Sequence, residues 1–211
     1  NTMMRIEIRE RIEIVQPNLL VVEGREEQLF FEALVKHLGL PSIQIMPIGG
    51  RARIRDYLRT LTKTPGFAEV ISLGIVRDAD EDPYGAFQSV CDALRYASLP
   101  VPERPLVSTG YNPKIVIMIL PEEGSPGMLE DLCLKAVEED LAMFCVDQYF
   151  QCLQERRVSP PSNPSKAKVQ VFLASRKEVK RLGEAAQAGY WPLDGKAFEQ
   201  VRNFLQEIVQ I

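Results

Sequence analysis

The sequence contains one histidine and four cysteines, and this scarcity excludes several kinds of catalytic and metal site. His37 is the only histidine among 211 residues, so zinc sites built from several histidines are excluded. A Ser-His-Asp or Cys-His site would have to use His37, which lies in a helical pattern without a supporting motif nearby. The cysteines form no CxxC motif, and we expect reduced core thiols in a cytoplasmic protein. They are Cys91, Cys133, Cys145 and Cys152.

Long apolar runs and strong positive charge are also missing. No apolar run approaches the ~20 residues of a membrane-spanning helix and no signal peptide is visible, so we expect no membrane partner. The net charge of −4 argues against a protein that is held on nucleic acid by bulk charge alone. It does not exclude a nuclease, because bound divalent cations reverse the sign of an acidic pocket. The content of 45% hydrophobic residues is enough for one substantial core.

Apolar runs alternate with helical patterns over the first 140 residues. The pattern predicts strands at 19–22, 43–48, 69–76 and 114–120. It predicts helices at 25–38, 51–63, 83–98 and 128–139. This order is typical of an α/β fold with an open sheet of about four mostly parallel strands and helices on both faces. We therefore expect an α/β core over residues 1–140, in which 1–18 form a lead-in with an alternating edge strand at 5–14.

Residues beyond 140 carry helical patterns only. Predicted helices cover 140–157, 166–179 and 195–209, with a Pro-rich linker at 158–165 and a loop through 189–192. We expect residues 141–211 to form a helical extension that packs on the same core.

Two of the predicted strands lead into carboxylates. Glu23 follows the apolar strand LLVV, and Glu27 lies one helical turn after it. Asp78 and Asp80 follow the apolar run VISLGIV, and alternate residues of an extended chain face the same way. Because the carboxyl ends of parallel strands meet at one edge, we expect one acidic pocket. Hard cations such as Mg²⁺ or Mn²⁺ prefer these oxygen ligands, and without cations such a cluster is unfavourable.

Each acidic motif also has a simpler interpretation. The acids of EGREE fit an ordinary helix N-terminus, where the helix dipole favours negative charge. DADEDP fits an acidic turn, and Asp82 before Pro83 is better explained as a turn residue than as a metal ligand.

A Gly-Gly turn precedes the second predicted helix. Gly49 and Gly50 would let backbone N–H groups approach a phosphate, and Arg51 would add a charged contact. A plain glycine turn is the alternative. The Walker motif GxxxxGK[ST] is absent.

The motifs VVEGREE, GGRARI and VRDADEDP, in this order, resemble the Toprim domain of topoisomerases, primases and overcoming-lysogenization-defect (OLD) nucleases. The Toprim hallmark, a Glu after the first strand and an Asp-x-Asp after a later one, is matched by Glu23, Asp78 and Asp80. The nearer resemblance is to the OLD-type branch and its small stand-alone members. That branch has a second Glu four residues on, matched by Glu27, and a Gly-Gly-basic turn.

Further features of the OLD-type branch fall later in the chain. Its Leu-Glu at a helix start is matched by Leu129 and Glu130, and its lysine by Lys166 or Lys168. The similarity to stand-alone members continues through GEAAQAGYWPLDGKAF, so it covers most of the chain. Two departures are visible: OLD nucleases carry an attached ATPase, and they often have a hydroxyl residue where this chain has Val76.

The resemblance implies divalent-metal-dependent phosphoryl transfer, most simply a Toprim-type nuclease acting on DNA or RNA. It implies that Mg²⁺ or Mn²⁺ is held by Glu23, Glu27, Asp78, Asp80 and Glu130. It implies that Glu23, Asp78, Asp80 and Lys166 are catalytic, while Gly49, Gly50 and Arg51 meet phosphate.

Two other interpretations remain open. The first is a non-catalytic Toprim-like module that binds metal and nucleotide or nucleic acid, as a homo-oligomer or as an accessory subunit. The second is a receiver-like phosphoacceptor domain, which also clusters acids at strand ends.

Overall fold

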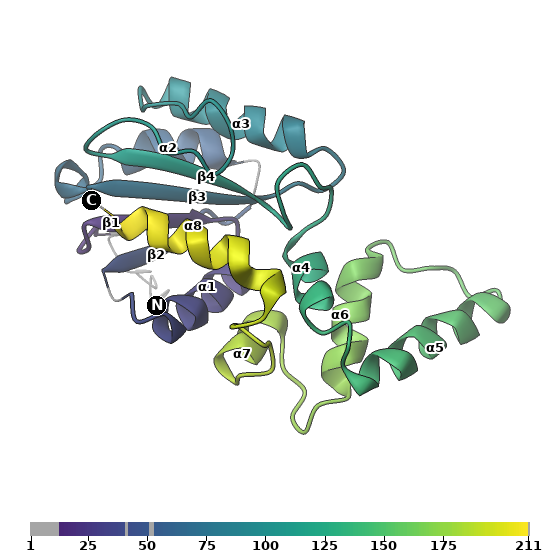
Figure 1. The fold of residues 1–211 in the computed structure, drawn as a ribbon. Helices are drawn as coiled ribbons and strands as arrows, with labels where there is room; N and C mark the ends of the chain where they lie inside the picture. The colour runs from purple at the N-terminus through teal and green to yellow at the C-terminus, as the bar shows by residue number, and fades with distance from the viewer. Residues whose placement is uncertain (1–12, 41, 51–52, 211) are drawn as a thin grey trace, which may run out of the picture.

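The computed structural model describes residues 13–40, 42–50 and 53–210. The edge strand predicted at 5–14 falls almost entirely outside them, and Arg51 lies outside them as well. The described residues form an α/β fold, as the sequence predicted (Figure 1). None of the helices in these residues has the length and apolar character that crossing a membrane requires.

The sheet in the described residues has four strands, and every pair of neighbours is parallel. Its order is β2-β1-β3-β4. The strands are β1 (Asn18–Val22), β2 (Ile43–Pro47), β3 (Ser72–Asp78) and β4 (Lys114–Leu120). Every residue of β1 is buried, as expected for a central parallel strand covered on both faces.

Strand β3 lies later in the chain than predicted. The predicted span 69–76 begins in η2 (Phe67–Glu69), a short 3₁₀ helix. The strand then continues through Arg77 and Asp78, because β4 pairs with it as far as Leu120. The polar residues Arg77 and Asp78 therefore belong to the sheet.

Helices cover both faces of the sheet (Figure 1). One face packs against α1 (Arg25–His37) and α8 (Glu199–Val209), and the other against α2 (Ile54–Leu61) and α3 (Pro83–Tyr96). Strand alternation sorts the core, so that Leu20 and Val22 face α1 and α8 while Leu19 and Val21 face α2 and α3.

The remaining helices follow β4. They are α4 (Leu129–Ala136), α5 (Leu141–Glu155), α6 (Pro164–Ala174) and α7 (Leu182–Gln187), with η3 (Lys196–Phe198) before α8. Helix α6 is shorter than the predicted helix at 166–179, and α7 was not predicted. Helices α5 and α6 extend away from the sheet as an arm (Figure 1).

Two glycines allow the late helices to approach the core. A Cβ on Gly183 would lie 2.6 Å from Leu29 Cβ and 2.7 Å from the Glu26 carbonyl oxygen, so glycine is needed where α7 meets α1. The Gly183 N–H also donates to Glu26 Oε2 at 2.8 Å. A Cβ on Gly74 would likewise overlap Ile208, which lies on α8 directly over β3.

The single histidine lies away from the strand ends, whereas the cysteines are divided between the core and α5. His37 Nε2 lies 2.8 Å from Asp194 Oδ1 and ties the end of α1 to the loop before α8. Cys91 and Cys133 are buried as expected, but Cys145 and Cys152 are exposed on α5. The expectation of core thiols is therefore wrong for this pair, because the apolar pattern of α5 runs around more of the helix than the core covers.

Candidate functional site

The candidate site lies where the connections of the sheet change direction. The chain runs from β1 to β2 on one side, and then crosses to β3 and β4 on the other, so the switch falls between β1 and β3. Open α/β sheets place their ligands at the carboxyl ends of the strands at such a point. Glu23 follows β1, and Asp78 is the last residue of β3.

The two carboxylates approach the end of the sheet from opposite faces. The register that pairs Val21 with Ile75 continues to place Glu23 beside Arg77, on the face covered by α2 and α3. Asp78 points the other way, where its Oδ1 accepts a hydrogen bond from the Leu129 N–H at 3.0 Å. The start of α4 therefore holds the Asp78 carboxylate.

Arg77 is a residue of the site that the sequence did not single out. Its Nη1 donates to Ser89 Oγ at 2.6 Å, and its Nε lies 3.6 Å from Glu23 Oε1. That separation is an ion pair but is too long for a hydrogen bond. Arg77 Nε and Glu23 Oε1 are both buried and without a hydrogen-bond partner in the described structure. The sequence feature that could have identified it was a positively charged residue placed between Val76 and Asp78, at the end of a predicted strand.

The carboxylates are electrostatically coupled. Burial raises the pKa of Glu23; Arg77 opposes this shift, while Glu27 and Asp80 add to it. Burial also raises the pKa of Asp78 well above its usual range, with further contributions from Glu23, Glu27 and Glu130. Glu27 thus acts on carboxylates that come from both faces of the sheet. The ionised pocket is unfavourable by itself, and a bound cation would relieve it.

Asp80 lies at a backbone junction between two loops. Its φ of 52° is left-handed, a conformation that an aspartate tolerates better than most residues. Its N–H donates to the Gly127 carbonyl at 2.8 Å, and the Gly127 N–H donates back at 2.7 Å. This bridge fixes the loop after β3 against the loop before α4. Asp82 caps α3 instead, since its Oδ1 accepts from the Gly85 N–H at 2.9 Å.

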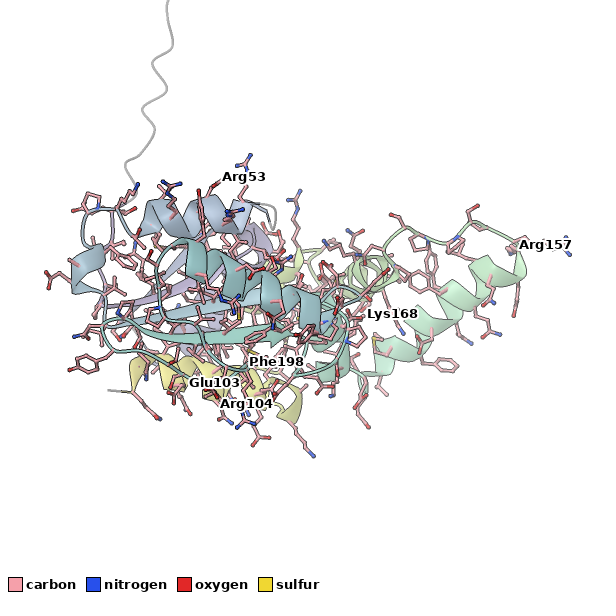
Figure 2. The ribbon with its side chains drawn as sticks, turned by 90° about the horizontal axis from the view of Figure 1, so that it is seen from above. Arg53, Glu103, Arg104, Arg157, Lys168 and Phe198 are labelled. Atoms are coloured by element: carbon pink, nitrogen blue, oxygen red, sulfur yellow. The ribbon has the colours of Figure 1, made fainter. Side chains whose placement is uncertain are left out.

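Glu130 and Lys166 meet at the α4 side of the site. Glu130 is only 9% exposed at the start of α4, and burial raises its pKa, with Lys166 opposing the shift. Lys166 Nζ lies 3.9 Å from Glu130 Oε1. Lys168 instead pairs with Asp147 of α5 at 2.6 Å, along the arm (Figure 2). Of the two lysines, Lys166 is therefore the one beside the acidic cluster.

The Gly-Gly turn contacts the site through its backbone. The N–H groups of Gly49 and Gly50 both donate to the Glu23 carbonyl at 3.0 Å. Both glycines have positive φ, 81° and 119°, which explains the residue type. Because these two amides are engaged, they do not offer hydrogen bonds to a phosphate at this turn. Arg53 is exposed at the start of α2 (Figure 2), and Arg51 lies outside the described residues.

The donor set fits a hard divalent cation, but the structure does not close a coordination sphere. The buried Glu23 Oε1 without a hydrogen-bond partner, next to several carboxylates, offers the oxygen donors that Mg²⁺ or Mn²⁺ prefers. Within residues 13–40, 42–50 and 53–210, no three His, Cys, Asp or Glu side chains converge closely enough to hold a metal ion. The division of Glu23 and Asp78 between the two faces accounts for this spacing.

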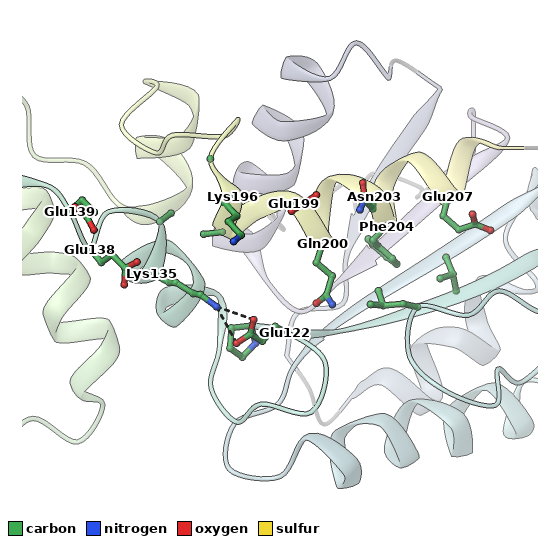
Figure 3. Close-up of a pocket in the computed structure, with 16 residues that line it drawn as sticks. Glu122, Lys135, Glu138, Glu139, Lys196, Glu199, Gln200, Asn203, Phe204 and Glu207 are labelled. Atoms are coloured by element: carbon green, nitrogen blue, oxygen red, sulfur yellow. Dashed lines mark hydrogen bonds and ion pairs between the residues drawn. The ribbon is translucent and has the colours of Figure 1, made fainter.

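A cavity of about 820 Å³ adjoins the acidic cluster. Arg77 and Asp80 line it from β3 and the following loop, and Asn163 and Ser165 line it from the start of α6. A larger cavity of about 900 Å³ lies between α8 and the region of Glu122 and Lys135, which pair at 3.0 Å (Figure 3). Of the predicted site residues that the structure describes, none lines the larger cavity and Asp80 lines the smaller one. We therefore place the candidate site at the smaller one.

Fold and site together define an α/β protein with an acidic pocket at the switch point of a parallel sheet. The chain belongs to the family described as protein of unknown function DUF3226, whose model matches residues 17–210. No curated protein matches the chain.

The fold is similar to two solved structures. The C-terminal region of the Xanthomonas campestris pv. campestris OLD protein is 14% identical, with a TM-score of 0.52, over 92% of this chain and 95% of that chain. The C-terminal region of the Burkholderia pseudomallei OLD protein is also 14% identical, with a TM-score of 0.52, over 92% and 98% of the two chains. This similarity establishes a shared fold.

Proposed function

We propose that the protein is a divalent-metal-dependent phosphodiesterase of the Toprim type, which cleaves DNA or RNA as the OLD nucleases do. The observation that carries the proposal is that Glu23, after β1, and Asp78, at the end of β3, come together at the switch point, with the buried Glu130 at the start of α4, the helix whose Leu129 N–H binds Asp78. Buried carboxylates that raise one another's pKa are costly unless a cation is bound, and this favours a functional cluster over a structural one. The fold shared with OLD C-terminal regions supports the same assignment.

The carboxylates would hold Mg²⁺ or Mn²⁺. The ligand set would be Glu23, Glu27, Asp78, Asp80 and Glu130. When bound, such a cation would stabilise the negative charge that develops on a phosphodiester during cleavage.

The other residues of the site would position the ligands and the substrate. The Leu129 N–H orients the Asp78 carboxylate, and the Asp80–Gly127 bridge fixes the second aspartate relative to α4. Lys166, more than half exposed beside Glu130, would contact the substrate phosphate.

The Arg77–Glu23 pair supports a second candidate function, a non-catalytic module that binds metal or nucleic acid. A guanidinium beside Glu23 already neutralises part of the cluster. If Arg77 stays beside Glu23 when metal is bound, Glu23 is lost as a metal ligand. The site would then bind metal or nucleic acid without cleaving a substrate.

The deciding experiment compares the wild type with Asp78→Asn. Single-stranded and double-stranded DNA and RNA are incubated with each protein in Mg²⁺ or Mn²⁺, and metal binding is followed by calorimetry. We expect metal-dependent cleavage by the wild type and a loss of at least about 100-fold in Asp78→Asn. Asp92→Asn, an exposed substitution on α3, is the matched control and should cleave normally.

The outcomes separate the two candidates. Equal cleavage by wild type and Asp78→Asn would reject the proposed site. Metal binding by the wild type that Asp78→Asn abolishes, without cleavage of any substrate, would assign the non-catalytic function.

A further inference from the structure

Helix α5 has two apolar faces, and the described residues cover only one of them. Met143 and Val146 are buried against the core. On the same helix Leu141 is 93% exposed, Phe144 68% and Tyr149 49%. The helix lies in the arm that projects from the sheet, with Arg157 at its tip (Figures 1 and 2). Large side chains so exposed and so close together mark an interaction surface.

The exposed side chains form one continuous row. At 3.6 residues per turn they fall on one side of α5, opposite Met143 and Val146. The row, which we call the α5 stripe, consists of Leu141, Phe144, Cys145, Gln148, Tyr149 and Cys152. No residue of the stripe is charged. A contact between the stripes of two copies would therefore bring no charges of the same sign together within the stripe; Glu155 lies on the same side of α5, just beyond its C-terminal end.

The spacing of the α5 stripe reads the same from both ends. Successive members are three, one, three, one and three residues apart. A second copy packed antiparallel can therefore match the whole stripe at once. In that register Leu141 lies opposite Cys152 of the second copy, and Phe144 lies opposite Tyr149. Each contact occurs twice about a two-fold axis, as an isologous interface requires.

The charges at the two ends of α5 select the same orientation. Glu138 and Glu139, both exposed, precede the helix. At its other end the exposed Arg156 and Arg157 outnumber the one exposed acid, Glu155. An antiparallel second copy brings the arginines of each chain to the acids of the other. A parallel copy would bring acids to acids and arginines to arginines.

We propose that the α5 stripe is the contact through which two copies of this chain form an antiparallel, two-fold symmetric dimer. The contact is limited to about four helical turns and buries less than the roughly 1,200 Å² of standard stable interfaces. The dimer should accordingly dissociate in the micromolar range and weaken with salt. The inference does not depend on the activity of the acidic pocket.

Sedimentation equilibrium on the full chain tests the association. We expect the wild type to shift from monomer to dimer as its concentration rises through the micromolar range. Phe144→Glu should weaken the association at least about tenfold, because it places a carboxylate against the second copy. Gln170→Glu adds the same charge to an exposed position on α6 and should leave the dimer intact. Since Phe144 is mostly exposed, circular dichroism should report the same fold in all three proteins.

The orientation is tested with two proteins that carry different single thiols on α5. One has Leu141→Cys, Cys145→Ser and Cys152→Ser; the other has Cys145→Ser alone and keeps Cys152. Under mild oxidation we expect a disulfide-linked dimer from the mixture and none from either protein alone. Covalent dimers from one protein alone would overturn the antiparallel arrangement. A wild type that stays monomeric throughout would overturn the proposal and assign the stripe to a different protein.

Discussion

Arg77 Nε lies 3.6 Å from Glu23 Oε1 where β3 and β1 end side by side. The pair is largely buried, and neither of these two atoms has a hydrogen bond within the described structure. The acidic pocket therefore carries its own cation. A divalent cation that binds Glu23 has to compete with the guanidinium, and this competition makes Arg77 the most informative residue to change.

Arg77→Gln should destabilise the metal-free protein and enlarge its response to metal. Without the guanidinium, the buried Glu23 carboxylate loses its only opposing charge among the causes of its pKa shift, and we expect a loss of about 1–3 kcal/mol. A saturating concentration of Mg²⁺ should then raise the melting temperature more in the variant than in the wild type. Thermal unfolding with and without Mg²⁺ measures both effects.

The control for this substitution is Arg95→Gln, which removes an exposed pair with Asp92. It should change stability by less than about 0.5 kcal/mol. Identical Mg²⁺ shifts in wild type and Arg77→Gln would mean that Arg77 does not compete with metal.

Stability of the metal-free protein should increase as the pH is lowered from neutrality. The pKa values of Glu23 and Asp78 are raised in the folded state, first by burial and then by neighbouring carboxylates. Groups of this kind contribute stability below their unfolded pKa, which is lost as the pH rises through the folded pKa. The free energy of unfolding should therefore fall over the pH range that begins at the ordinary pKa values, 4.5 for Glu23 and 3.8 for Asp78, and ends at their raised values in the folded state. Chemical denaturation from pH 5 to pH 8 should follow this trend.

Asp78→Asn identifies the source of that pH dependence. The amide oxygen can still accept from the Leu129 N–H, so the substitution removes charge with little change of shape. We expect it to flatten the profile and to stabilise the metal-free protein at pH 7, because it removes a buried charge. An unchanged profile would show that the buried acids do not control it.

Lys166→Ala and Lys168→Ala form a matched pair. Lys166 lies by Glu130 and Lys168 by Asp147, two residues apart in sequence but directed to different elements. If the protein cleaves nucleic acid, Lys166→Ala should reduce cleavage by about 10- to 100-fold, and Lys168→Ala by less than about twofold. Gel-based cleavage assays at fixed metal concentration compare them. Equal losses would remove the special role of Lys166.

Gly74→Ala should force α8 away from the sheet. The added methyl group would overlap Ile208, and we expect a cost of about 1–3 kcal/mol from overpacking. Ile208→Val removes the nearest atom, so the double variant should be more stable than the sum of the two single effects predicts. Denaturant unfolding of all four proteins measures this coupling, and strict additivity would contradict the contact.

The sequence predicted well those helices and strands that have a clear local pattern, and it missed those that tertiary contacts stabilise. Strand β4 was predicted to the residue, because its apolar run is bounded by Pro113 and Pro121. Helix α7 was missed because a six-residue helix has little pattern of its own and is held by packing on α1. The end of β3 was missed because polar residues there are held by the ladder to β4.

The strand-end carboxylates were predictable because alternating strands and helices bring such ends to one edge. The position of Arg77 beside Glu23 could not be predicted from the sequence, because it follows from the register of β3 against β1. The choice between Lys166 and Lys168 depends in the same way on how α6 packs against α4. The orientation of the Gly49 and Gly50 amides toward the Glu23 carbonyl is a tertiary contact that no local pattern contains.

That last contact has a mechanical consequence. Because the N–H groups of Gly49 and Gly50 both donate to the Glu23 carbonyl, the main chain at Glu23 is held to the Gly-Gly turn before α2. Any adjustment of this carboxylate to a ligand has to come from rotation of its side chain. Conversely, a force applied to the Gly-Gly turn, for example by a bound polyanion, would act directly on the main chain of Glu23 through these two hydrogen bonds.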